Sequence, residues 1–110
     1  MKMIIAVLRP EQLPAVKNSI HEAGVQHFSA IPIQGTAPKT EQLVYRGVER
    51  QVSLFKRVRL EIVTKDPDVE NVMEAISKGA KESGGHGRVF VLPVDDVLTI
   101  WTGEKGDDAF

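Results

Sequence analysis

The feature that most constrains this chain is a long polar segment, Gly35 to Arg59, between two stretches of alternating apolar residues. The segment contains Pro38 and Gly47 and is rich in lysine and arginine. Connections longer than about 12–15 residues without secondary structure are uncommon, and they are usually functional or disordered. We therefore expect two halves joined by a basic arm at about residues 36–57, with function where the arm meets the body.

The first half reads as strand, helix, strand. The apolar run at residues 3–8 predicts a buried strand. A helix follows Pro10 and ends before Gly24, because proline is tolerated in the first turn and glycine is favoured after the last. Residues 25–34 predict the second strand, and Pro32 indicates either a sheet edge or a bulge, because proline cannot donate to a ladder.

The second half repeats this order. Residues 58–63 and 88–94 predict strands, and Asp66 or Asp68 caps the helix between them. Two strand–helix–strand units in tandem are typical of the ferredoxin-like fold, an α+β domain whose antiparallel sheet carries both helices on one face. We expect one domain over residues 1–110, with an extended piece at 97–101 and a polar tail at about 102–110. The open sheet face keeps apolar residues, which favours a symmetric ring of copies.

Composition excludes several functions. The 110 residues include no cysteine, so disulfides and thiol catalysis are excluded and a reducing cytoplasm is the expected setting. The net charge of −1 argues against nucleic acid, and no apolar run is long enough to insert into a membrane. The three histidines, His21, His27 and His86, lack metal-ligand spacing, and no catalytic constellation stands out, so we expect a non-enzymatic protein.

Two features of the sequence, a glycine-rich loop and a single tryptophan, each allow two interpretations. The glycine-rich loop from Ser83 to Arg88 lets backbone N–H groups approach a phosphate, with Arg88 as a fixed charge, or it is a flexible connector. Trp101 is either a core or subunit-interface anchor or a platform for a base.

The chain resembles the PII signal-transduction family along nearly its whole length. The matching stretches are MKMIIAVLRPEQLPAVKNSIHEAG, YRGVERQV, VRLEIV, GHGRVFVLPV and TGEKGDDA. The resemblance implies a compact homotrimer with adenine-nucleotide sites in the clefts between subunits. It also implies that the arm is a T-loop, which contacts a membrane transporter or an enzyme and regulates it.

The resemblance also implies site residues. Matching nucleotide-site positions are Ser29, Gly35, Glu61, Val63, Gly85, His86, Gly87 and Arg88. The family's G-D-G-K reads here as residues 85–88, with His86 in place of the aspartate. The family's R-I-R-T-G-E reads as residues 99–104, so both arginines expected on the outer phosphates are missing. We therefore expect ADP or AMP to bind more tightly than ATP.

The arm departs from the family as well. A glutamine that helps hold magnesium, ATP and 2-oxoglutarate is absent, and Arg50 replaces the tyrosine that is uridylylated in many bacteria, so that modification is impossible here. These changes suggest a divergent branch, such as the carboxysome-associated, bicarbonate-responsive one, with an anion site at Arg46, Gly47 and Arg50. The alternative is a nitrogen-regulatory protein that controls an ammonium transporter or a nitrogen-assimilation enzyme through ATP, ADP and 2-oxoglutarate.

Overall fold

The computed structural model describes residues 1–36 and 53–110. Within these residues, strands and α-helices alternate in the predicted order. They are β1 (Lys2–Leu8), α1 (Leu13–Glu22), β2 (Ser29–Thr36), β3 (Leu54–Thr64), α3 (Val69–Lys81) and β4 (Arg88–Pro93). Short 3-10 turns, Pro10–Gln12 and Asp66–Asp68, lead into the two helices, and a third, Gly106–Ala109, lies near the C-terminus.

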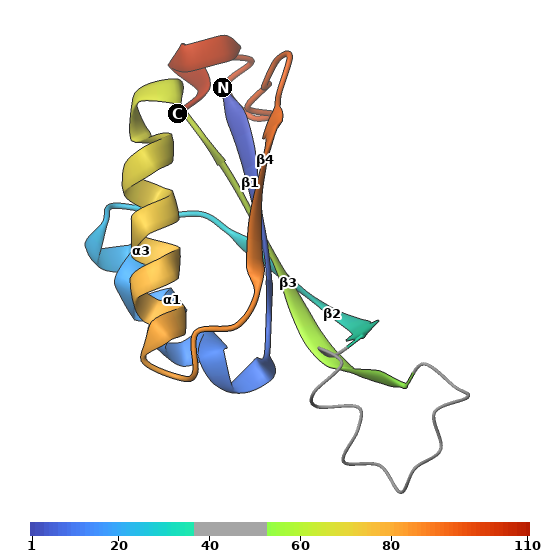
Figure 1. Cartoon of the computed structure of the whole chain (residues 1–110). Coiled ribbons are helices and arrows are strands. Elements are labelled where there is room, and N and C mark those ends of the chain that lie inside the picture. Colours follow the sequence, from blue (N-terminus) through green and yellow to red (C-terminus); the bar gives the residue numbers. More distant parts are fainter. Residues whose placement is uncertain (37–52) are drawn as a thin grey trace, which may run out of the picture.

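The four strands form one sheet in the order β2-β3-β1-β4, and every neighbouring pair is antiparallel. Both helices cover the same face of the sheet, as Figure 1 shows. This is the predicted ferredoxin-like arrangement. β2 is an edge strand, one of the two positions that Pro32 indicates, and the two halves interleave because β1 pairs with β3 on one side and β4 on the other.

The core lies between the sheet and the helices. Ile4 pairs with Ile62 in the β1–β3 ladder, and both side chains are buried against the helices. The other main members of this core are Ala6, Leu8, Leu60, Val16, Ile20, Val72 and Ile76. Where α1 and α3 meet, a Cβ added at Gly79 would lie 2.6 Å from the Cα of Val16, so the helices pack more closely than any larger residue allows.

The strands at the root of the arm differ from the predicted boundaries. β2 starts later than predicted, at Ser29, and runs to Thr36, while β3 starts earlier, at Leu54. The ladder therefore continues to the pair Thr36 and Leu54, inside the predicted arm at 36–57. The sequence did not predict this extension, because polar residues on the exposed part of β3 interrupt the alternation of apolar residues that indicates a strand.

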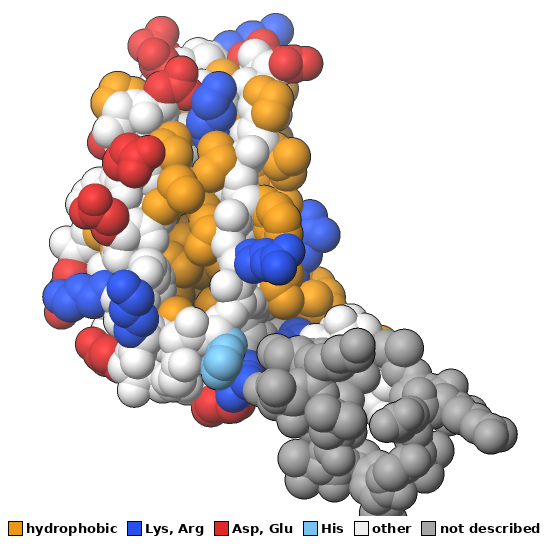
Figure 2. All heavy atoms as spheres, in the orientation of Figure 1, with side chains coloured by type: hydrophobic (Ala, Val, Ile, Leu, Met, Phe, Trp, Pro, Cys, Tyr) orange, Lys and Arg blue, Asp and Glu red, His pale blue; other side chains and the backbone are white. Residues whose placement is uncertain are grey.

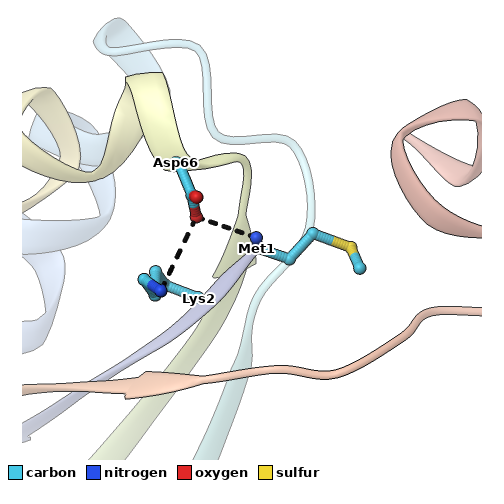
Figure 3. Close-up of polar contacts among 3 residues, drawn as sticks. All are labelled: Met1, Lys2 and Asp66. Atoms are coloured by element: carbon cyan, nitrogen blue, oxygen red, sulfur yellow. Dashed lines mark hydrogen bonds and ion pairs between the residues drawn. The ribbon is translucent and has the colours of Figure 1, made fainter.

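Asp66 has a different role from the predicted helix cap. Its Oδ1 accepts a hydrogen bond of 2.8 Å from the N-terminal ammonium group of Met1, and the Nζ of Lys2 lies 4.0 Å away (Figure 3). The hydrogen bond from Met1, with the charge of Lys2, lowers the pKa of the Asp66 carboxyl from its usual value. The contact ties the start of β1 to the turn that begins α3.

The extended piece predicted at 97–101 is extended only as far as a single bridge, and a turn begins at Ile100. A single bridge pairs Leu98 with Lys105, and the N–H of Thr99 donates to the carbonyl of Glu104 at 2.9 Å. Ile100 and Trp101 lie at the tip with exposed fractions of 88% and 87%. The interpretation of Trp101 as a core residue is therefore wrong.

Candidate functional site

A basic cleft lies at the end of the sheet where β1 ends and β4 begins. Its volume is about 340 Å³, and its functional side chains and close backbone belong to Arg9, Arg57, His86, Gly87, Arg88 and Phe90. Among the described residues, no carboxylate lines it. The cleft adjoins the root of the arm, because Leu8 at the end of β1 pairs with Val58, the residue after Arg57.

The glycine-rich loop forms one wall of this cleft. After α3 ends, the N–H of Gly85 donates to the carbonyl of Ala80 at 3.0 Å, which turns the chain back toward the sheet. Gly87 has a φ of +121°, and a Cβ there would lie 2.7 Å from the carbonyl oxygen of Val7. Glycine is therefore required at this position both for its backbone conformation and for its contact with β1.

A buried glutamine lies behind the same wall. Gln12 is completely buried, and its side chain bonds to the backbones of Arg9, Ala80 and His86. Sequence analysis missed this residue, because a glutamine at the start of a helix is normally solvent-exposed and no local pattern marks its distant partners.

A second group of predicted residues lies on the sheet face that the helices leave open. Ser29 and Glu61 are direct partners in the β2–β3 ladder. Glu61 and Val63 alternate with the buried Leu60 and Ile62, so their side chains point away from the helices.

Arg59 joins this second group from the same face of β3. One Nη of Arg59 lies 3.5 Å from a carboxylate oxygen of Glu61, whose side chain is 24% exposed. The Nε of Arg59 is buried and makes no hydrogen bond among the described residues. The open face of the sheet therefore holds a buried N–H donor, on Arg59, beside the half-buried carboxylate of Glu61.

The structure brings together only part of the predicted site. His86, Gly87 and Arg88 line the cleft, and Gly85 precedes them in the loop. Gly35 lies on β2 opposite Phe55, and with Ser29, Glu61 and Val63 it lies outside the cleft lining. One chain therefore presents two groups of predicted site residues, one at the cleft and one farther along β2 and β3. The predicted anion-site residues Arg46, Gly47 and Arg50 lie outside the described residues.

The cleft also contains residues that sequence analysis did not assign to the site. Arg9 directly follows β1, and Arg57 was counted only as part of the basic arm. Phe90 is 49% exposed beside them. The signal for Arg9 was available, since a charged residue that ends a buried strand lies at the sheet end where loops and ligands meet.

Residues 1–36 and 53–110 contain neither a metal-binding cluster nor a membrane-spanning helix. These residues contain no group of three His, Cys, Asp or Glu side chains placed to hold a metal ion. Neither α-helix in this part of the chain has the length and apolar character needed to cross a bilayer.

Comparison with known proteins gives the family. The family model described as "Nitrogen regulatory protein P-II" matches residues 1–104. The chain is 39% identical to the nitrogen regulatory protein P-II of Azospirillum brasilense, over 99% of both chains. It is 37% identical to the nitrogen regulatory protein GlnK1 of Methanosarcina mazei, over 99% of this chain and 97% of the relative. The chain therefore belongs to the nitrogen regulatory protein P-II family, whose members are signalling regulators rather than enzymes.

Proposed function

We propose that this protein binds an adenine nucleotide at the basic cleft and, through its arm, regulates a transporter or enzyme of nitrogen assimilation. The cleft is the observation that supports nucleotide binding. Its position at the root of the arm would let a bound nucleotide affect the arm. The nitrogen role is inferred from the names of relatives that match the chain over nearly its whole length.

The chemistry of the cleft suits a phosphorylated ligand. Three arginines, Arg9, Arg57 and Arg88, line it, and a guanidinium can bind phosphate oxygens through two parallel hydrogen bonds. Gly87 holds the backbone of the loop against β1 at the wall of the cleft. Phe90 adds an apolar surface, which free phosphate would not need and an organic phosphate would use.

The site is completed by a second copy of the chain in a homotrimer. Ile31, Phe90 and Leu92 are 39%, 49% and 44% exposed on or beside the open face, an unusual exposure for large apolar strand residues. Packing copies through this face would cover them. It would also bring Ser29, Glu61 and Val63 of one copy toward the cleft of another, uniting the two groups that lie apart in one chain.

ADP and AMP are the favoured nucleotides. The turn at residues 99–104 carries Thr99 and Trp101 where the family has arginines for the outer phosphates. Each charge-assisted hydrogen bond contributes about 1.5–3 kcal/mol, so their loss weakens ATP more than ADP.

Calorimetric titration with AMP, ADP and ATP tests this proposal. We expect ADP to bind more tightly than ATP, and Arg88→Ala to weaken ADP by about tenfold or more. Lys17→Ala removes the same charge from the exposed surface of α1 and should leave the affinity unchanged. Tighter binding of ATP would contradict the nucleotide preference, and no binding of any of the three would contradict the nucleotide site itself.

Repeating the titrations with a second small molecule separates the two signalling roles. The names of the relatives favour nitrogen regulation, whereas a bicarbonate role depends on Arg46 and Arg50, which lie outside the described residues. A change in nucleotide affinity with 2-oxoglutarate would support the nitrogen role even though the arm lacks the family's glutamine. A response to bicarbonate alone would support the inorganic-carbon role instead.

A further inference from the structure

We propose that Gln12 is a positioning residue for the basic cleft, and that its buried amide fixes the glycine-rich loop against the end of β1. The inference about ligand affinity rests on the proposed nucleotide function. The inference about the loop does not, because it concerns the protein without ligand.

The hydrogen bonds of Gln12 join three parts of the chain. Its Oε1 accepts from the N–H of Arg9 at 2.8 Å. Its Nε2 donates to the carbonyl of Ala80 at 3.3 Å and to the carbonyl of His86 at 3.2 Å. The last two partners lie 68 and 74 residues away in sequence, so one side chain holds together the end of β1, the end of α3 and the loop.

Two of these partners belong to residues that line the cleft. Arg9 and His86 both line the cleft, and Gln12 bonds to the backbone of each. Gly84, Gly85 and Gly87 all have positive φ, so the loop between α3 and β4 has little conformational preference of its own. An anchor at the carbonyl of His86 therefore sets where Gly87 and Arg88 enter the cleft.

The position requires the chemistry of glutamine. A primary amide supplies one acceptor and two N–H donors, which matches one N–H group and two carbonyls. Glutamate keeps the acceptor but would turn a carboxylate oxygen toward two carbonyls. Methionine has a similar length but supplies neither the acceptor nor the donors, so the N–H of Arg9 and the carbonyl of His86 would lose this partner. The carbonyl of Ala80 would keep the N–H groups of Ser83 and Gly85.

Amide hydrogen exchange of the ligand-free protein tests the positioning role. We expect Gln12→Met and Gln12→Glu to speed exchange of residues 84–88 by about tenfold or more, since a buried hydrogen bond is lost. Glu11→Gln, an exposed change in the same turn, should leave exchange unchanged. Ile76→Val, a buried change in α3, serves as the control for general destabilisation. If the Gln12 variants expose the loop no more than Ile76→Val does at an equal loss of melting temperature, the inference is wrong.

Wild-type protein provides a measurement that does not depend on the folding of a variant. The side-chain amide protons of Gln12 should exchange slowly with solvent, and exchange at the rate of a free glutamine amide would overturn the inference. ADP titrations then test the consequence for the site, with an expected loss of about tenfold in affinity for Gln12→Met and none for Ile76→Val. If wild-type protein binds no ADP, the nucleotide proposal fails, while the exchange results still decide the role of Gln12.

Discussion

The two faces of the sheet differ in how far their apolar side chains are buried. On the helix-covered face, Ile4 and Leu60 are fully buried and Ile62 is 2% exposed. On the open face, Phe90 and Leu92 of β4 remain about half exposed. On the same face, Arg59 and Glu61 of β3 form an ion pair. Figure 2 shows hydrophobic side chains on both sides of the β4 backbone, one side facing the helices and the other without cover.

This difference separates stability from assembly. The covered face contains the interlocked side chains that determine whether the chain folds. The open face mixes apolar and charged side chains in the way that subunit interfaces do, with Arg59 and Glu61 beside apolar strand residues. Substitutions on the covered face should therefore lower the stability of the fold, and substitutions on the open face should disrupt assembly.

The largest expected effect comes from a cavity on the covered face. Leu60→Ala should lower the free energy of unfolding by about 2–5 kcal/mol, because it removes a fully buried side chain from a packed core. Urea unfolding followed by circular dichroism measures this. A loss below about 1 kcal/mol would mean that the two faces do not differ as described.

An intermediate effect comes from a charge on the open face. Leu92→Asp should leave the helical signal intact but convert the oligomer to monomers, because the side chain is 44% exposed in the single chain and would be buried between copies. Sedimentation velocity measures the assembly state. Lys17→Asp, on the exposed surface of α1, is the control, and an unchanged oligomer in Leu92→Asp would rule out this face as the interface.

The smallest effect is expected at the end of the sheet where β1 begins, at the contact between Met1 and Asp66. The Asp66 carboxyl has a lowered pKa in the folded protein, so it stabilises the fold above its unfolded pKa and loses this contribution as the pH falls through its folded pKa. Asp66→Asn should therefore reduce the melting temperature at neutral pH, and the difference from wild type should disappear in acid. Asp68→Asn is the control, and a constant difference at every pH would contradict the ion pair with Met1.

Much of this architecture could be predicted from the sequence. The apolar periodicity of β1 and α3 and the positions of Pro10, Pro32 and Gly24 gave the order of elements and the edge strand. These signals are local, so a single sequence carries them. The ends of β2 and β3 were misplaced because their outer residues pair through backbone hydrogen bonds and need no apolar pattern.

The site was harder to predict for a different physical reason. His86, Gly87 and Arg88 were identified because a glycine-rich loop followed by an arginine is a local signal. Phe90 and Gln12 acquire their roles only when the ends of β1, α3 and β4 meet, which no local pattern reveals.

The central claim is that copies of this chain assemble through the open face and together bind an adenine nucleotide. Native mass spectrometry of the purified protein with ADP tests both parts in one spectrum. We predict a trimer that carries up to three ADP molecules. A monomer, or a trimer that retains no ADP, would contradict the account.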